Sequence, residues 1–130
     1  MTKYRFDHIH FRSKDIEFTK KFWLEILGAR LIKERELLGA PSYTFDLNGT
    51  SILVSGRGAG EKFEDSVSEN LYGFWHFALL VNDISLSLQE LKKQKIECFH
   101  DSWEIRKGVK VAFVRGPDNI SIELIERQNV

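Results

Sequence analysis

Two stretches of the sequence share one pattern: His-Ile-His-Phe-Arg-Ser-Lys-Asp-Ile at residues 8–16 and His-Phe-Ala-Leu-Leu-Val-Asn-Asp-Ile at residues 76–84. In each, a histidine lies in a strand-like run, and an Asp-Ile pair stands seven residues later, where an apolar pattern with helical spacing begins. Aspartate at that place is a typical helix N-cap, so each stretch predicts a strand followed by a helix. A shift of 68 residues relates the copies and also superposes Phe45 on Phe113. This repeat predicts a duplicated unit.

The rest of each copy predicts three more strands. Asn48-Gly49 is a strong hairpin turn, and Gly116-Pro117-Asp118-Asn119 makes the last turn of the second copy. The sequence therefore predicts an α+β fold in which two βαβββ modules form curved mixed sheets around a shared cleft, since one module cannot bury its own sheet face. The expected strands are 4–13, 29–36, 42–47 and 51–55 in the first copy and 74–81, 96–100, 109–115 and 120–125 in the second, with helices at 15–27 and 83–94.

The length of 130 residues predicts a single domain. Its two modules span about residues 1–56 and 73–130. The stretch between them is polar and rich in glycine, which is typical of an exposed linker or a mobile lid.

Composition excludes several classes of function. Nineteen lysines and arginines balance nineteen aspartates and glutamates, so no net charge attracts the chain to nucleic acid or to an anionic membrane. Cys98 is the only cysteine and predicts a buried apolar side chain in a reducing compartment. No window approaches the roughly 20 apolar residues that span a bilayer. We expect a cytoplasmic protein whose partner is a small molecule.

His8 and His76 occupy equivalent positions of the two modules, and Glu123 lies in the last predicted strand between Ile122 and Leu124. A carboxylate in such a place usually has a partner. Two imidazoles and one carboxylate suit ferrous iron, manganese, nickel or zinc and leave positions open for a substrate. His10 shares the strand face of His8 and remains an alternative ligand or a supporting donor.

The strand faces predict the roles of two further charged residues. Arg12 lies on the same predicted face as His8, and its guanidinium is suited to an anionic substrate, although an exposed solvated charge is the commoner role. Glu126 is expected to point to the face opposite Glu123 and to be solvated.

Four segments closely resemble the vicinal oxygen chelate superfamily, which includes glyoxalase I, extradiol dioxygenases, fosfomycin-modifying thiol transferases and bleomycin-resistance proteins. The resemblance implies that His8, His76 and Glu123 bind one divalent ion (Zn, Ni, Mn or Fe) and that Glu123 also carries a proton in catalysis. The segments are Phe-Asp-His-Ile-His-Phe-Arg at 6–12, Phe-Trp-Leu-Glu-Ile-Leu-Gly-Ala at 22–29, His-Phe-Ala-Leu-Leu-Val at 76–81 and Arg-Gly-Pro-Asp-Asn-Ile-Ser-Ile-Glu-Leu at 115–124.

One departure from that family concerns a fourth ligand. Glyoxalase I carries a glutamate or glutamine on the fourth strand of the first module. Here the corresponding residue is Leu53 if the turns are aligned, or Ser55 if the shift of 68 holds. Neither residue supplies a carboxylate, so a base is lost together with a ligand.

The resemblance implies a metal-dependent, glyoxalase-like lyase or isomerase acting on a small substrate that chelates the ion through neighbouring oxygens. The alternatives are a metal-independent drug-binding or metabolite-binding module, a fosfomycin-type thiol transferase and an extradiol dioxygenase. Modules of this kind pair within one chain or across two. We expect a homodimer, in which His8 of one protomer would meet His76 and Glu123 of the other.

Overall fold

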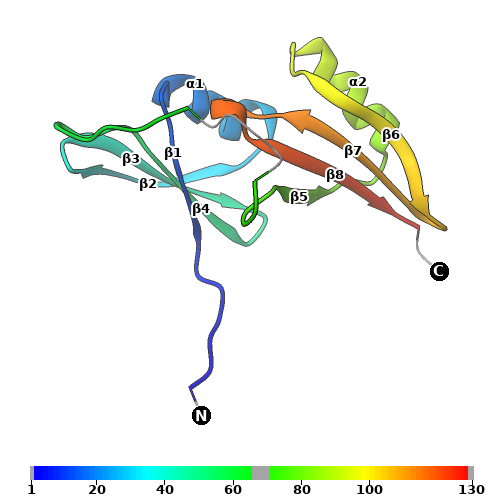
Figure 1. The fold of residues 1–130 in the computed structure, drawn as a ribbon, viewed down its shortest axis with the longest axis horizontal. Coiled ribbons are helices and arrows are strands. Elements are labelled where there is room, and N and C mark those ends of the chain that lie inside the picture. The colour runs from blue at the N-terminus through cyan, green and yellow to red at the C-terminus, as the bar shows by residue number, and fades with distance from the viewer. Residues whose placement is uncertain (1, 66–70, 129–130) are drawn as a thin grey trace. The chain divides into compact units, whose positions relative to one another are not determined.

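The computed structural model describes residues 2–65 and 71–128. The chain divides into two compact units, Met1–Glu64 and Asp65–Val130. Each unit contains one four-stranded sheet, and Figure 1 labels the strands. No helix among the described residues is long and apolar enough to cross a membrane.

The sheet of the first unit has the strand order β1-β4-β3-β2, with β1 parallel to β4 and the other neighbours antiparallel. Helix α1 continues into a π-helical turn, η1. The elements are β1 (Ile9–Arg12), α1 (Ile16–Lys21), η1 (Phe22–Ile26), β2 (Arg30–Leu37), β3 (Ala40–Leu47) and β4 (Thr50–Ser55).

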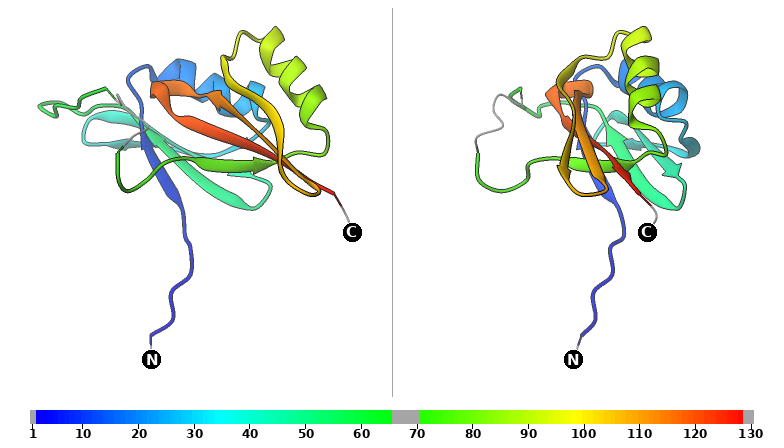
Figure 2. Two further views of the ribbon diagram at one scale, coloured as in Figure 1. Left: turned by 45° about the vertical axis from the view of Figure 1, so that its right-hand side comes forward. Right: turned by 90° about the vertical axis from the view of Figure 1, so that its right-hand side faces the viewer.

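The second unit repeats this topology with the order β5-β8-β7-β6, and β5 is parallel to β8. Helix α2 lies along one face of the sheet (Figure 2). The predicted α+β fold with two βαβββ modules is confirmed. The elements are β5 (Phe77–Leu80), α2 (Ile84–Lys93), β6 (Cys98–Arg106), β7 (Val109–Arg115), a short 3₁₀ turn η2 (Pro117–Asn119) and β8 (Ser121–Arg127).

Both predicted helix caps are present. The carboxylate of Asp15 accepts the backbone N–H of Phe18 at 3.1 Å, and that of Asp83 accepts the N–H of Leu86 at 3.0 Å. Glu126 also contributes, because its Oε1 accepts the N–H of Ile84 at 2.9 Å. The expectation that Glu126 is merely solvated was therefore wrong: this side chain helps to satisfy the first turn of α2.

The hairpin between β3 and β4 forms as predicted. Asn48 and Gly49 have φ values of 48° and 100°, and positive φ at both central residues is the geometry of a two-residue turn that follows the twist of a hairpin. The turn between β7 and β8 is longer and includes η2.

This difference in turn length changes the register between the two units. Ile9 pairs with Ile52, which faces Phe45. The equivalent Phe77 pairs with Ile122, which faces Val114. The structural counterpart of Phe45 is thus Val114.

The superposition of Phe45 on Phe113 was therefore wrong by one residue, and a one-residue slip reverses the face of a strand. Phe45 packs under the helical side, its ring 6.5 Å from that of Trp23. Phe113 lies opposite Glu123 on the other side of its sheet.

Each sheet is covered on one face by its helix, and the apolar residues between them form the core. Full burial of such side chains contributes roughly 1.5–3 kcal/mol each. We call the opposite side of each sheet its open face. The largest core residues include Phe22, Trp23, Phe45 and Val54 in the first unit and Ile84, Leu88, Val114 and Ile122 in the second.

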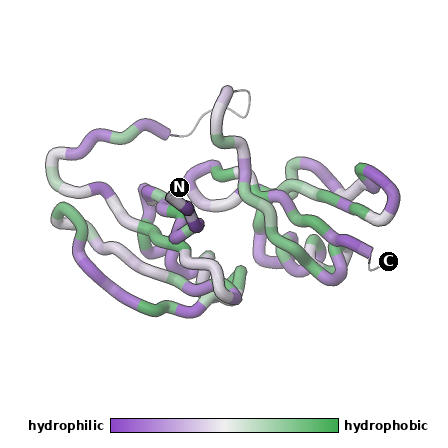
Figure 3. The backbone as a smooth tube through the Cα atoms, turned by 90° about the horizontal axis from the view of Figure 1, so that it is seen from below, coloured by the Kyte–Doolittle hydropathy of each residue, from purple (hydrophilic) through white to green (hydrophobic). Residues whose placement is uncertain are grey.

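The chain after β4 is mostly hydrophilic, as Figure 3 shows, yet it is held to the first unit. The N–H of Ala59 donates to the carbonyl of Leu38 at 3.3 Å, in the turn between β2 and β3. Gly58 is buried there, while Arg57 and Ala59 on either side are exposed.

Candidate functional site

The second unit brings two of the predicted ligands together on its open face. His76 directly precedes β5, and Glu123 lies in β8 beside Ala78 of β5. Nε2 of His76 is 3.7 Å from Oε1 of Glu123, and both side chains are 17% exposed. This separation is too long for an N–H···O hydrogen bond.

The pair is suited to a divalent ion. Two donor atoms that each lie about 2.1 Å from one ion can be up to about 4.2 Å apart. The observed 3.7 Å is within that limit. In addition, Nδ1 of His76 is buried and has no hydrogen-bond partner among the described residues, so this imidazole is not used by the fold as a hydrogen-bonded core histidine.

His8 lies in the first unit, directly before β1. It was predicted within a strand, but β1 begins only at Ile9, and the preceding residues extend away from the sheet (Figure 1). Nδ1 of His8 is 2.6 Å from Oδ2 of Asp7. Because an ionised carboxylate only accepts hydrogen bonds, Nδ1 of His8 donates to Asp7, and Nε2 is the nitrogen that this contact does not use.

The meeting of His8 with His76 and Glu123 stays a prediction. No group of three or more His, Cys, Asp or Glu side chains suited to hold an ion gathers within the part of the chain that the structure describes.

The position equivalent to Glu123 is occupied by Leu53. In the first unit the parallel partner of His10 is Leu53, and in the second unit the partner of Ala78 is Glu123. The alternative, Ser55, lies two residues further along β4. The first unit therefore has an apolar side chain where the second has its carboxylate.

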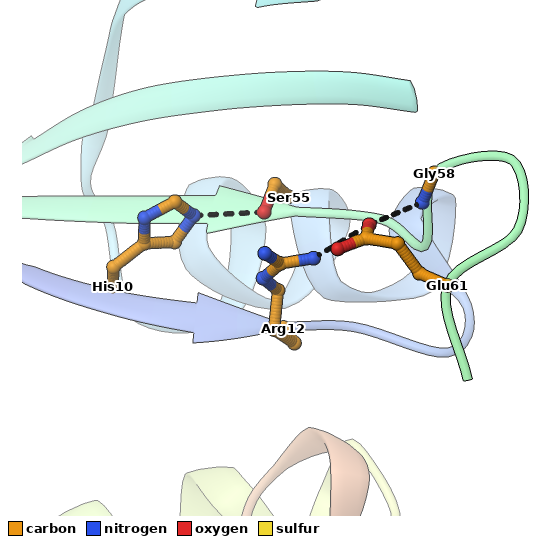
Figure 4. Close-up of polar contacts among 5 residues, drawn as sticks. All are labelled: His10, Arg12, Ser55, Gly58 and Glu61. Atoms are coloured by element: carbon orange, nitrogen blue, oxygen red, sulfur yellow. Dashed lines mark hydrogen bonds and ion pairs between the residues drawn. The ribbon is translucent and has the colours of Figure 1, made fainter. Parts of the chain in front are cut away.

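His10 and Ser55 contact each other on the open face of the first unit, as Figure 4 shows. Nε2 of His10 is 2.8 Å from the hydroxyl of Ser55, which is fully buried. Burial lowers the pKa of His10, the positive charge of Arg12 lowers it further, and His8 does so when it is protonated. His10 is accordingly a neutral imidazole near pH 7.

Arg12 forms an ion pair within its own unit (Figure 4). Its Nη1 donates to Oε1 of Glu61 at 3.0 Å, and the same oxygen accepts the N–H of Gly58 at 2.8 Å. Its guanidinium also lies 4.7 Å from the ring centre of Phe63. The hydrogen bond from Arg12 lowers the pKa of Glu61. The predicted substrate role of Arg12 stays a prediction, and Glu61 is a partner that sequence reasoning missed.

A row of aromatic rings lies beside His76. Trp75 and Phe113 have ring centres 5.8 Å apart at an angle of 20°, and Phe113 and Trp103 are 6.2 Å apart at 30°. The ring of His76 meets Trp75 edge-on at 4.4 Å. Such a row can stack against a planar apolar group. The sequence alone does not predict a role for Trp75 or Trp103.

Comparisons with known proteins agree with this architecture. Residues 5–124 match the family model described as the Glyoxalase/Bleomycin resistance protein/Dioxygenase superfamily. The lactoylglutathione lyase GLX1 of Arabidopsis thaliana is 27% identical over 135 residues, which cover 95% of this chain and 44% of the relative. The chain spans less than half the length of this and two further plant relatives.

Solved structures share the fold. A glyoxalase family protein from Bacillus cereus superposes with a TM-score of 0.87 at 16% identity, covering 99% of this chain and 97% of that protein. The fosfomycin resistance protein FosX from Listeria monocytogenes, complexed with Mn(II) and sulfate, superposes with a TM-score of 0.72 at 18% identity, covering 98% and 95%.

Proposed function

The chain belongs to the Glyoxalase/Bleomycin resistance protein/Dioxygenase superfamily, and from this membership we propose that it is a metal-dependent, glyoxalase-like lyase or isomerase. Its substrate is a small molecule that chelates the ion through two neighbouring oxygens. Similarity to lactoylglutathione lyases supports this class of reaction, and the Mn(II) complex of FosX supports a divalent ion in this fold.

The observation that carries the proposal is the approach of His76 to Glu123. Their 3.7 Å separation, on an open face and without a hydrogen bond, leaves both groups able to bind a third species. A buried structural pair would instead be closed by a direct hydrogen bond, because a partly buried carboxylate without a partner costs free energy.

We assign a role to each group. His8 through Nε2, His76 through Nε2 and Glu123 hold one divalent ion, of zinc, nickel, manganese or iron. When bound, the ion supplies Lewis-acid polarisation of a substrate carbonyl. Glu123 takes a proton from the adjacent carbon as general base. Because Leu53 cannot accept a proton, Glu123 also returns it.

The remaining assignments follow from this scheme. Arg12 binds an anionic group of the substrate once Glu61 releases it. We place the protein in the cytoplasm as a homodimer. In this homodimer His8 of one protomer would join His76 and Glu123 of the other as the third ligand, because the first unit supplies His8 and the second unit supplies His76 and Glu123.

The first test measures the ion itself. Elemental analysis of the purified protein and titration calorimetry with nickel, zinc, manganese and anaerobic ferrous iron should give one ion per chain. Interconversion of S-lactoylglutathione with the hemithioacetal of methylglyoxal and glutathione, and turnover of other small substrates with neighbouring oxygens, should then require that ion. A folded protein that binds none of these ions would overturn the proposal.

The row formed by Trp75, Phe113 and Trp103 favours a second candidate, a binding module that holds a planar apolar ligand without metal. The double variant His8→Ala, His76→Ala separates the two. A binding module keeps its affinity for such a ligand in this variant, whereas the metalloenzyme loses turnover.

A further inference from the structure

The open face of the first unit carries an extra imidazole next to the place where a carboxylate is missing. The paired positions are His10 and Leu53 in the first unit and Ala78 and Glu123 in the second. β4 carries an apolar side chain where β8 carries an acid, and β1 carries an imidazole where β5 carries a small side chain. In the first unit the polar donor of this pair of positions therefore lies on β1 rather than on β4.

His8 and His10 project to the same side of the chain because they are two residues apart. Their ring centres are 6.4 Å apart. Both rings have one nitrogen held by another side chain, His8 by Asp7 and His10 by Ser55. If the hydroxyl of Ser55 accepts from Nε2 of His10, then Nδ1 of His10 keeps its lone pair, and each ring offers one nitrogen to an ion.

We propose that His10 is a further ligand of the divalent ion, replacing in the first unit the carboxylate that Glu123 provides in the second, and that Ser55 is its positioning residue. This inference rests on the proposed function, because it needs the ion that His8, His76 and Glu123 hold.

The proposal makes the donor set three imidazoles and one carboxylate. Nitrogen-rich sets suit nickel, zinc and iron, whereas oxygen-rich sets suit magnesium and manganese. The site should therefore select nickel and zinc over manganese. His100 offers no comparable alternative, because it is exposed on β6 and its Nδ1 contacts the backbone carbonyl of Asp101.

The experiment counts coordinated nitrogens in the full-length protein. Pulsed electron paramagnetic resonance of the Cu(II)-loaded protein should detect three histidine nitrogens, and His10→Ala should reduce them to two. Calorimetry with nickel should show at least about a tenfold loss of affinity for His10→Ala and a smaller loss for Ser55→Ala. His100→Ala is the matched control and should change neither readout.

His10→Gln separates the loss of a ligand from a folding defect, because glutamine can keep a hydrogen bond to Ser55 but offers no imidazole. Circular dichroism and the melting temperature check both variants. If His10→Gln is folded and still shows three coordinated nitrogens with unchanged nickel affinity, the role of His10 is refuted while the proposed function stands. If the folded wild-type protein binds no ion, both fail.

Discussion

His76 and Glu123 come within 3.7 Å of each other on the open face of the second unit, yet they do not form a hydrogen bond. Their placement follows from the register of β5 and β8, in which Glu123 lies beside Ala78, two residues after His76. The register of β5 and β8 thus sets the approach of the imidazole to the carboxylate.

Replacing Glu123 by glutamine should weaken binding of nickel or zinc by at least about tenfold, because an amide oxygen is a poorer ligand than a carboxylate and carries no charge to offset the ion. Calorimetry measures this change. Glu90→Gln is the matched control, since Glu90 is exposed on α2. Equal affinities of the two variants for nickel or zinc would show that Glu123 is not a ligand of the ion.

A bound nickel ion should quench the fluorescence of Trp75, because the ring of His76 is only 4.4 Å from its indole. Titration of the wild-type protein should show saturable quenching that Trp75→Phe largely abolishes. Trp103→Phe changes a tryptophan of the same aromatic row but should retain most of the signal. The reverse result would place the ion elsewhere on the protein.

The sequence predicted the elements whose signals are local. Asp15 and Asp83 predict the helix starts because an N-cap depends only on residues within one helical turn. Asn48-Gly49 predicts a hairpin because both residues tolerate positive φ. It placed β6 at residues 96–100, whereas the strand runs from Cys98 to Arg106. Register shifts along the β6–β7 pairing interrupt the simple alternation on which such a prediction depends.

The candidate site was only partly predictable. The duplication pointed to His8 and His76, and the apolar neighbours of Glu123 pointed to that carboxylate. The structure brings His76 and Glu123 together. A constant shift could not show that Leu53 is the counterpart of Glu123, because the longer turn before β8 changes the register. The contact of Arg12 with Glu61 also could not be predicted from the sequence. It joins residues 49 positions apart, and it depends on the path of the loop that carries Glu61.

Glu126→Ala should lower the free energy of unfolding by about 1 kcal/mol, because the N–H of Ile84 then loses its acceptor at the start of α2. Glu126→Gln should cost less, since an amide oxygen still accepts that hydrogen bond but adds no negative charge at the helix N-terminus. Urea denaturation measures both. Glu90→Ala, away from the cap, should stay within about 0.5 kcal/mol of wild type. Equal stability of the two alanine variants would refute the capping role.

Acidification should release Glu61 from Arg12. The hydrogen bond from Arg12, and next that from the N–H of Gly58, lower the pKa of Glu61 below its ordinary value of 4.5. The ion pair therefore contributes its full stability above the pKa of the unfolded chain and loses it as the pH falls through the lower pKa of the folded protein.

The difference in unfolding free energy between wild type and Glu61→Gln, followed from pH 7 downward, should accordingly be constant at first and shrink only below about pH 4.5. Glu64→Gln is a control on the same segment, because Glu64 is exposed. A difference that grows on acidification would contradict the assigned direction.

Gly58 should tolerate no side chain, because a Cβ built at this position would clash with the backbone oxygen of Leu38. Gly58→Ala must then displace the loop, at a cost of about 1–3 kcal/mol. Gly56→Ala is the matched control, since its Cβ would meet only Ala40 and Ile16 at ordinary contact distances. It should change stability by no more than about 0.5 kcal/mol.

The same displacement should uncouple Arg12 from Glu61, because the N–H of Gly58 binds the carboxylate oxygen that Arg12 also contacts. A double-mutant cycle tests this link: Glu61→Gln should cost stability in the wild-type background and almost nothing in Gly58→Ala. Additive costs in the two backgrounds would show that the loop does not hold Glu61 in place. Non-additive costs would show that the packing of Gly58 against the turn between β2 and β3 holds Glu61 in place. Gly58 would then determine whether Arg12 is paired with Glu61.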